Sequence, residues 1–343
     1  MRHFRFLRNP QPSTFGNNLE SFLLALGGPA CLYLDGCDSS RTRALVTLQH
    51  GNEPSGAMAL FRYLRSGQKP AVNVVCIVPS VPAALEPPLC SHRMLPRARD
   101  LNRCFRPPFE GSQGRLAEEI LEILHLHNPE AVLDIHNTSG SGPGFAVVTH
   151  MDRQHDALAS LFTDRMVISN LGLGALMEIS ESLYPTVTIE VGGRLDEPAH
   201  ELAYEGLCRY FGNQQVLNVG DADWGPELFV DPIRLELGEH TTLCYADERS
   251  KHHDITLKTD IEHHNFGTVD HNTLLGWVGE ADVPLFTAID KNGNCALDRL
   301  IRIEQGKLYP AGELKLFMIT SNPAIATTDC LFYAAVEQSR LTE

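Results

Sequence analysis

The chain has 343 residues, 43% hydrophobic and 21% charged, which is typical of a folded globular protein and excludes a disordered one. Its 28 Lys and Arg against 43 Asp and Glu give a formal net charge of -15, which disfavours binding to nucleic acid or to an anionic membrane. The cysteines are scattered and form no C-x-x-C pair, so we expect reduced thiols. We see no apolar leader after the basic N-terminus and no apolar run long enough to cross a bilayer. We therefore expect a cytoplasmic protein.

Strands and helices alternate along residues 1–215. The expected strands are 44–49, 71–78, 131–136, 145–149 and 186–191, and the expected helices are 54–64, 114–127 and 197–211. Near-continuous apolar strands that alternate with helices are typical of a largely parallel sheet covered on both faces. We therefore assign residues 1–215 to one α/β domain that carries the catalytic site.

From residue 216 the pattern changes to short β-type runs separated by turn signals. The expected strands are 233–237, 241–245, 254–257, 274–278 and 314–319. No convincing amphipathic helix separates them. We therefore expect a smaller β-rich domain over residues 216–343, and we expect it to shape the substrate entrance.

The sharpest chemical feature is His50-Gly51-Asn52-Glu53, directly after the strand 44–49. At a strand-to-helix junction this spacing can turn an imidazole and a carboxylate toward one point, at the edge where open α/β sheets bind ligands. Another strand ends in His136, which Asn137 follows. Two histidines and one carboxylate are the ligand set of many catalytic zinc sites. A helix-capping His beside a surface Glu is the alternative for an isolated H-x-x-E.

Two further carboxylates lie on expected strands. Glu190 stands near the end of the strand 186–191, where burial makes a carboxylate unexpected. It is either a general base with a raised pKa or a salt-bridged residue at the sheet rim. Asp134 faces the same side of its strand as His136, so it either orients a ligand or makes structural hydrogen bonds.

Arginine, without any lysine, is concentrated between Ser91 and Arg106 of this acidic chain. The arginines are Arg93, Arg97, Arg99, Arg103 and Arg106. Because arginine holds carboxylates through two parallel hydrogen bonds, the cluster suits recognition of an anionic substrate. A solvated face paired to local acids is an equally good interpretation.

Four motifs in this order, HGNE, DLNR, DIHN and TIEVGG, resemble the succinylglutamate desuccinylase/aspartoacylase family, which is related to the zinc carboxypeptidases. The resemblance covers Val46 to about Phe211 and continues in the C-terminal part through NFGTVDHNTLLGWVGE and LKLFMITSNP. It implies a zinc-carboxypeptidase-like α/β fold with a mixed, mostly parallel sheet flanked by helices, plus a smaller C-terminal β-rich domain. It also implies a deacylase that hydrolyses carbon–nitrogen bonds other than peptide bonds.

The resemblance further implies a catalytic role for four matching residues. His50, Glu53 and His136 would bind one zinc ion per chain. Glu190 would be the general base that activates the zinc-bound water and then protonates the leaving amine.

The resemblance also implies how a substrate is held. Arg103, with Asn102, would bind a substrate carboxylate, and Asn137 would line the pocket. An arginine ahead of DLNR usually polarises the scissile carbonyl in this family. The spacing here departs from the family pattern, so the candidates are Arg93, Arg97 and Arg99, and we favour Arg93.

The expected reaction converts a small anionic N-acyl amino acid into a carboxylic acid and a free amino acid. A carboxypeptidase-type metallopeptidase is the first alternative, and a non-catalytic carboxylate-binding protein of the same family is the second. The acyl group stays open because DIHNTSG resembles aspartoacylase whereas the C-terminal segment resembles succinylglutamate desuccinylase. Homo-oligomer formation and the physiological metal also stay open, since His/carboxylate sites bind several divalent ions.

Overall fold

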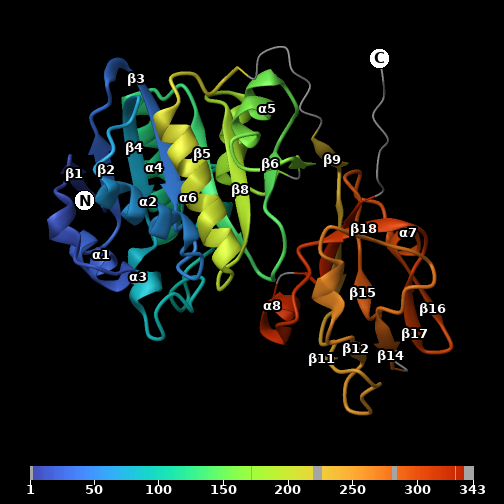
Figure 1. The fold of residues 1–343 in the computed structure, drawn as a ribbon. Coiled ribbons are helices and arrows are strands. Elements are labelled where there is room, and N and C mark those ends of the chain that lie inside the picture. Colours follow the sequence, from blue (N-terminus) through green and yellow to red (C-terminus); the bar gives the residue numbers. More distant parts are fainter. Residues whose placement is uncertain (1–2, 171, 219–225, 280–283, 329, 336–343) are drawn as a thin grey trace. The chain divides into compact units, whose positions relative to one another are not determined.

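The computed structural model describes residues 3–170, 172–218, 226–279, 284–328 and 330–335 (Figure 1). The chain forms two compact units. The first comprises residues 1–137, 144–166 and 170–227, and the second comprises 138–143, 167–169 and 228–343. None of the helices in the described ranges has the length and apolar character needed to cross a membrane.

The strands of the first unit belong to a nine-stranded sheet. Its strands are β1 (Arg5–Arg8), β2 (Ala30–Leu34), β3 (Asp38–Thr47), β4 (Val72–Val78), β5 (Val132–Thr138), β6 (Phe145–Val148), β7 (Arg165–Ile168), β8 (Thr186–Gly193) and β9 (Glu227–Val230). They are ordered β1-β2-β4-β3-β5-β8-β6-β7-β9. The pairs β1–β2, β3–β4 and β3–β5 are parallel, whereas β2–β4 and β6–β8 are antiparallel. The mixed sheet expected from the sequence is confirmed.

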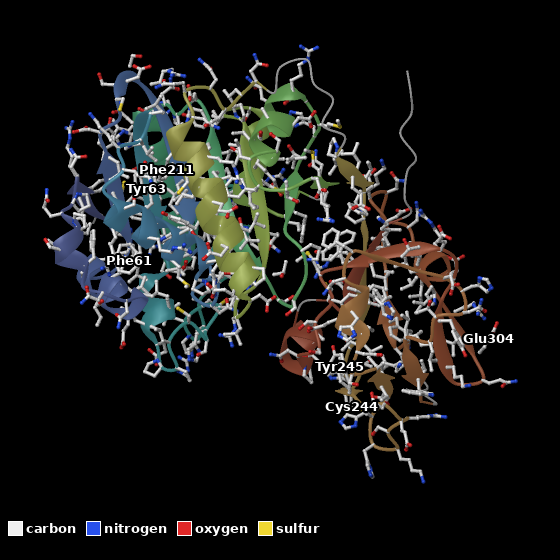
Figure 2. All side chains as sticks on the ribbon, viewed as in Figure 1. Phe61, Tyr63, Phe211, Cys244, Tyr245 and Glu304 are labelled. Carbon is white, nitrogen blue, oxygen red and sulfur yellow. The ribbon has the colours of Figure 1, made fainter. Side chains whose placement is uncertain are left out.

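Helices cover both faces of this sheet (Figure 1). They are α1 (Leu19–Leu26), α2 (Ser55–Ser66), α3 (Val81–Leu85), α4 (Gly111–His127), α5 (Arg153–Ala159) and α6 (Glu197–Gly212), with 3-10 turns η1 (Pro12–Phe15), η2 (Leu101–Arg103) and η3 (Leu176–Glu181). Ile120 and Leu124 of α4 share a core with Val46 of β3. On the other face Tyr63 of α2 meets Phe211 of α6 edge to face, with ring centroids 4.8 Å apart (Figure 2).

A glycine at the start of α2 fixes how this helix meets the sheet. A Cβ at Gly56 would lie 2.0 Å from the Thr47 Oγ1 of β3, so only glycine permits this approach. The expected strand 44–49 ends at Thr47, because Leu48 takes a left-handed φ of 56°. Leu48 and Gln49 therefore lie with His50 in the turn between β3 and α2 rather than on the strand.

The second unit contains two five-stranded sheets around its own core. Its strands are β10 (Ile233–Leu237), β11 (Leu243–Tyr245), β12 (Ile255–Leu257), β13 (Gly267–Val269), β14 (Gly276–Val278), β15 (Phe286–Thr287), β16 (Ile301–Glu304), β17 (Lys307–Pro310), β18 (Leu314–Phe317) and β19 (Phe332–Ala335). The sheet orders are β13-β18-β19-β10-β15 and β11-β12-β14-β17-β16. The helical elements here are short: η4 (Ile261–His264), α7 (Leu297–Leu300) and α8 (Pro323–Thr328). Buried Leu235, Leu257, Leu308 and Phe332 contribute to the core, so the expected β-rich character is confirmed.

Candidate metal centre

Two parallel neighbouring strands bring together the three predicted metal ligands. The turn after β3 carries His50 and Glu53, and β5 carries His136 near its carboxyl end. All three are buried, with exposed fractions of 3%, 6% and 3%. The His50 Nδ1 lies 2.8 Å from the Glu53 Oε1, and the His136 Nδ1 lies 2.7 Å from the Glu53 Oε2. The Glu53 carboxylate thus links the two imidazoles.

The donor set fits a divalent metal ion. One ligand atom from each of His50, Glu53 and His136 lies within 4.8 Å of the other two. Two imidazole nitrogens and a carboxylate oxygen are the protein ligands of many catalytic zinc sites, in which a fourth position stays open for water. The three residues can therefore hold a metal ion at this buried position.

Each of the two histidines has a carboxylate on its second ring nitrogen. The His50 Nε2 lies 2.8 Å from the Asp100 Oδ1, and the His136 Nε2 lies 2.9 Å from the Asp134 Oδ2. The Gln49 Nε2 also donates to that Asp134 oxygen, at 2.7 Å. Such partners fix the tautomer and the ring orientation of ligand histidines. Both rings therefore direct their Nδ1 atoms toward Glu53.

The contact of Asp134 with His136 favours the ligand-orienting interpretation over the purely structural one. Sequence reasoning gave no role to Asp100, although it begins the DLNR motif. The chemical signal was available, because ligand histidines regularly give their second nitrogen to a carboxylate or carbonyl. The sequence could not show which of the chain's carboxylates this would be.

The centre shifts the pKa values of its own members. Burial acts to raise the pKa of Glu53, but His50 and His136 outweigh it and hold that pKa far below its usual range. Burial acts to lower the pKa of His136, but Asp134 and Glu53 raise it well above the ordinary value. The pKa of His50 is raised against burial by Glu53 and Asp100. These groups exist as a buried set of opposite charges, from which a metal would displace protons.

Glu190 lies on β8, the strand beside β5 in the sheet order. Its Oε2 is buried and has no hydrogen-bond partner within the described part of the chain. Burial raises the pKa of Glu190 to about 7, while the charge of His136 lowers it and that of Glu53 raises it. A carboxylate with a pKa near neutrality can accept and release a proton at physiological pH.

The structure distinguishes among the three candidate arginines. The Arg93 Nη1 lies 3.3 Å from the Glu53 Oε1, and its Nη2 lies 2.9 Å from the Asp100 Oδ2. Arg97 and Arg99 are exposed, and across the described ranges neither has a hydrogen bond or ion pair with the three predicted ligands. Arg93 is therefore the one of the three that contacts the His50–Glu53–His136 cluster.

The predicted substrate-binding residues have protein partners in the structure. The Asn102 Oδ1 accepts a hydrogen bond from the Leu176 N–H at 2.8 Å, and the Arg103 Nη1 donates to the Asn102 carbonyl at 2.7 Å. The Asn137 Nδ2 donates to the Gly192 carbonyl and to the Ser55 Oγ, each at 2.8 Å. Asn137 thus ties β5 to β8 and to the start of α2.

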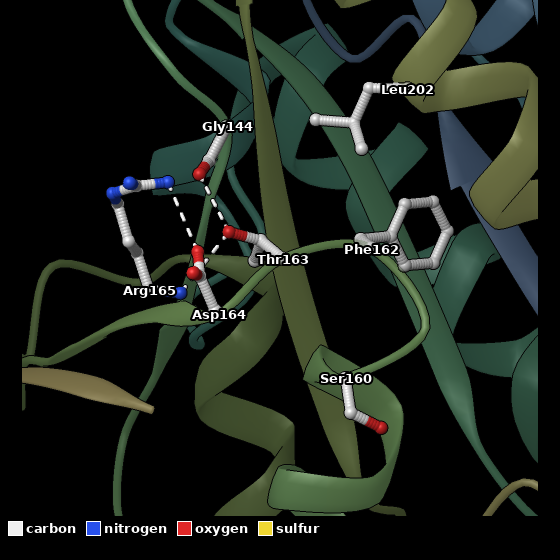
Figure 3. A pocket seen from close by; sticks show the side chains of 7 residues that line it. All are labelled: Gly144, Ser160, Phe162, Thr163, Asp164, Arg165 and Leu202. Carbon is white, nitrogen blue, oxygen red and sulfur yellow. Dashed lines mark hydrogen bonds and ion pairs between the residues drawn. The ribbon is translucent and has the colours of Figure 1, made fainter. Parts of the chain in front are cut away.

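A hollow elsewhere in the first unit is separate from this centre. Figure 3 shows the hollow, whose volume is about 400 Å³. Its rim carries an ion pair between Arg165 and Asp164 and a hydrogen bond from the Thr163 Oγ1 to the Gly144 carbonyl. The lining residues are Gly144, Ser160, Phe162, Thr163, Asp164, Arg165 and Leu202. None of these is a predicted site residue.

The family model of the succinylglutamate desuccinylase/aspartoacylase catalytic domain matches residues 40–207. This segment contains the four motifs and the whole His50–Glu53–His136 cluster. Residues 40–207 therefore form a catalytic domain of the succinylglutamate desuccinylase/aspartoacylase family. No curated protein sequence matches the chain significantly.

Solved structures share the fold over most of the chain. A succinylglutamate desuccinylase/aspartoacylase from Rhodobacter sphaeroides is 15% identical, covers 91% of this chain and 88% of its own, and has a TM-score of 0.56. The succinylglutamate desuccinylase from Chromobacterium violaceum is 13% identical, with coverages of 91% and 89% and a TM-score of 0.57. Murine aminoacylase 3 is 16% identical, with coverages of 87% and 95% and a TM-score of 0.54. At these identities the comparisons establish a common fold.

Proposed function

We propose that the protein is a zinc-dependent deacylase that hydrolyses the amide bond of a small anionic N-acyl amino acid. The observation that carries this proposal is a buried His-Glu-His donor set beside Glu190, whose pKa is raised to about 7. The family of the catalytic domain supports the reaction class. The expectation that the second unit shapes the substrate entrance stays a prediction.

His50, Glu53 and His136 would hold the metal ion. Once bound, such an ion lowers the pKa of a coordinated water toward about 7 and polarises a carbonyl. Glu190 accepts a proton from the attacking water and later delivers it to the nitrogen of the leaving amine. The carbon–nitrogen bond breaks, and a carboxylic acid and a free amino acid leave. No other base is required, because one carboxylate serves both proton transfers.

The arginines supply the positive charge that an anionic substrate and its transition state need. Arg93, placed against Glu53 and Asp100, would stabilise the developing oxyanion. Arg103 would bind the α-carboxylate of the substrate, and Asn102 would position Arg103 through its carbonyl. In a chain of net charge -15, such a local cationic patch focuses an anion that the rest of the surface repels.

The reaction class is tested by metal analysis and a substrate panel. The purified protein is expected to contain zinc in the His50–Glu53–His136 centre and to release free amino acid from N-acetyl-aspartate, N-succinyl-glutamate or a related N-acyl amino acid. Neutral analogues and dipeptides belong to the same panel. Turnover of dipeptides alone would identify the metallopeptidase alternative. A zinc-loaded, folded protein without any turnover would support the non-catalytic alternative.

The role of Glu190 is tested by Glu190→Gln, which keeps the shape and removes the base. We expect zinc to stay bound while kcat falls about 10²–10⁴-fold, the usual contribution of a general base. The matched control is Glu122→Gln on the exposed side of α4, which should leave kcat unchanged. Near-normal turnover of Glu190→Gln would show that another group is the base. His136→Ala should lose activity together with the zinc ion of the His50–Glu53–His136 centre.

A further inference from the structure

A second group of potential metal ligands lies between β6 and α5. One ligand atom from each of His150, Asp152 and His155 lies within 4.8 Å of the other two. The His155 Nδ1 is 2.8 Å from the Asp152 Oδ1, and the His150 Nε2 is 3.4 Å from the Asp152 Oδ2. The two imidazole rings meet edge to face with centroids 4.5 Å apart. From this convergence we propose that the three residues bind a divalent metal ion such as zinc.

The second nitrogen of each ring already has a partner. The His155 Nε2 lies 2.6 Å from the Ser180 Oγ, and the His150 Nδ1 lies 3.0 Å from the Thr149 Oγ1. These contacts leave the His155 Nδ1 and the His150 Nε2 directed at the same carboxylate. Ligand histidines are oriented through their second nitrogen in just this way. Both rings are therefore held in position before an ion arrives.

The carboxylate is also fixed by the fold. Asp152 is the N-cap of α5, and its Oδ1 accepts hydrogen bonds from the Gln154 and His155 N–H groups at 2.8 and 2.9 Å. These bonds set the orientation of the carboxylate, whose Oδ2 is turned toward His150. A ligand set locked by backbone hydrogen bonds loses little conformational entropy on binding.

One of the three side chains is buried and the other two are partly exposed to solvent. The His155 side chain is 2% exposed, whereas those of His150 and Asp152 are 47% and 41% exposed. An ion can therefore enter from solvent on the His150 side, and water can complete its coordination. His155 would anchor the ion to the interior of the unit.

This group is distinct from the first metal centre. In the antiparallel β6–β8 pair, Phe145 stands opposite Glu190 and Val147 opposite Thr188. The chain beyond β6 therefore runs away from Glu190, toward the beginning of β8. Ser180, which contacts His155, also accepts a hydrogen bond from the Thr186 N–H at the start of β8. The proposed ion would be structural and would fix the start of α5, which the His155–Ser180 contact links to η3 and to the beginning of β8.

The test is the zinc stoichiometry and affinity of the full-length, metal-free protein, measured by calorimetric titration with Zn²⁺ and by native mass spectrometry. We expect two equivalents for the unchanged protein. His150→Gln and Asp152→Asn should each weaken one equivalent at least about tenfold while the other equivalent is unaffected. Asn is as good an N-cap as Asp, so Asp152→Asn removes the charge and keeps the helix start. His125→Gln, at an exposed histidine of α4, is the matched control and should bind both equivalents.

A background without the first centre separates the two sites. His136→Ala should still bind one equivalent, and adding His150→Gln should abolish it. The proposal is overturned if the unchanged protein binds a single equivalent that His136→Ala abolishes. It is equally overturned if both His150→Gln and Asp152→Asn keep two equivalents of unchanged affinity. Because the readout is zinc binding, it does not depend on whether the protein proves to be a deacylase.

Discussion

At the scale of single residues, the surroundings shift the pKa values of two neighbouring glutamates in opposite directions. Glu53 lies between two imidazoles, which hold its pKa far below the ordinary range against the effect of burial. Glu190 lies on β8 with its Oε2 buried and without a hydrogen bond, and its pKa rises to about 7. Environments that separate the pKa values of like groups are typical of sites in which one carboxylate stays ionised and the other exchanges a proton.

The raised pKa of Glu190 predicts a pH-dependent cost to stability. Its pKa in the folded protein, about 7, exceeds the ordinary value of 4.5. The stability associated with the protonated form is therefore complete below pH 4.5 and is lost as the pH rises through 7. The glutamine of Glu190→Gln cannot ionise, so this variant should keep that stability at high pH. At pH 8 the metal-free variant should therefore be more stable than the unchanged metal-free protein by up to about 3 kcal/mol. At pH 4 the two proteins should be alike.

Urea unfolding of the metal-free proteins at pH 4 and pH 8 measures this difference. Glu122→Gln provides the control at both values. An equal stability of Glu190→Gln and the unchanged protein at pH 8 would contradict the buried, unpaired state of this carboxylate. The comparison uses metal-free protein because a bound cation would itself favour the ionised form.

Removing the charge of either carboxylate that contacts a histidine Nε2 should weaken metal binding. Asp134→Asn keeps the shape of a fully buried side chain but removes the charge that faces the His136 Nε2. We expect zinc affinity to fall about 10–100-fold, as is usual for partners of ligand histidines. Asp100→Asn should act similarly through His50. Competition with a chromophoric chelator measures the zinc affinity. Asp298→Asn, at an exposed position, is the control. Unchanged zinc affinity in both Asp134→Asn and Asp100→Asn would refute the orienting role.

At the scale of secondary-structure elements, the close packing of α6 against its neighbours requires a glycine at position 206. A Cβ at Gly206 of α6 would lie 2.1 Å from the Phe162 Cδ1, and Phe162 is a buried ring. Gly212, at the end of the same helix, has no atom within 4 Å of a Cβ built on it. A larger side chain therefore fits at position 212 but not at position 206.

This contrast predicts stability changes of opposite sign within one helix. Gly206→Ala should destabilise the protein by about 1–3 kcal/mol, because overpacking outweighs the helix preference of alanine. Gly212→Ala should be neutral or stabilising by up to about 1 kcal/mol. Urea denaturation midpoints of the two variants give the comparison. A Gly206→Ala protein as stable as the Gly212→Ala protein would show that Phe162 yields without cost.

At the scale of the whole molecule, the candidate metal centre belongs to one unit only. His50, Glu53 and His136 lie within residues 1–137, and the core of the second unit is formed by residues of its own sheets. A ligand that binds the folded state stabilises it by mass action, about 2.7 kcal/mol at one hundred times its Kd. The stabilisation should be concentrated where the ligand binds.

Hydrogen exchange with and without zinc tests this localisation. Metal should increase protection in residues 48–54 and 132–137, while β10 and β19 in the second unit should exchange at unchanged rates. His136→Ala should abolish the zinc-dependent protection in residues 48–54. A zinc response confined to the second unit would place the main metal site elsewhere.

The local pattern of the sequence determined the main elements and the metal-ligand candidates. Apolar runs predicted β4, β5, β6 and β8 to within a few residues, because buried strands need little more than continuous apolar side chains. The strands β2 and β7 and the short edge strands β1 and β9 were not predicted from those patterns, since their burial depends on neighbours distant in the sequence. The end of β3 at Thr47, two residues before the predicted end, also escaped prediction, because it follows from the left-handed backbone conformation of Leu48.

The sequence by itself therefore determined the α/β class, the four motifs and the residues able to bind a metal. Only the tertiary structure decided that Arg93 rather than Arg97 or Arg99 contacts the cluster, and that Asp100 and Asp134 orient its histidines. It also decided that the Oε2 of Glu190 is buried without a partner. The physical reason is that residue type follows from the chain alone, whereas distance and burial depend on the order β3-β5-β8, which brings together segments far apart in the sequence.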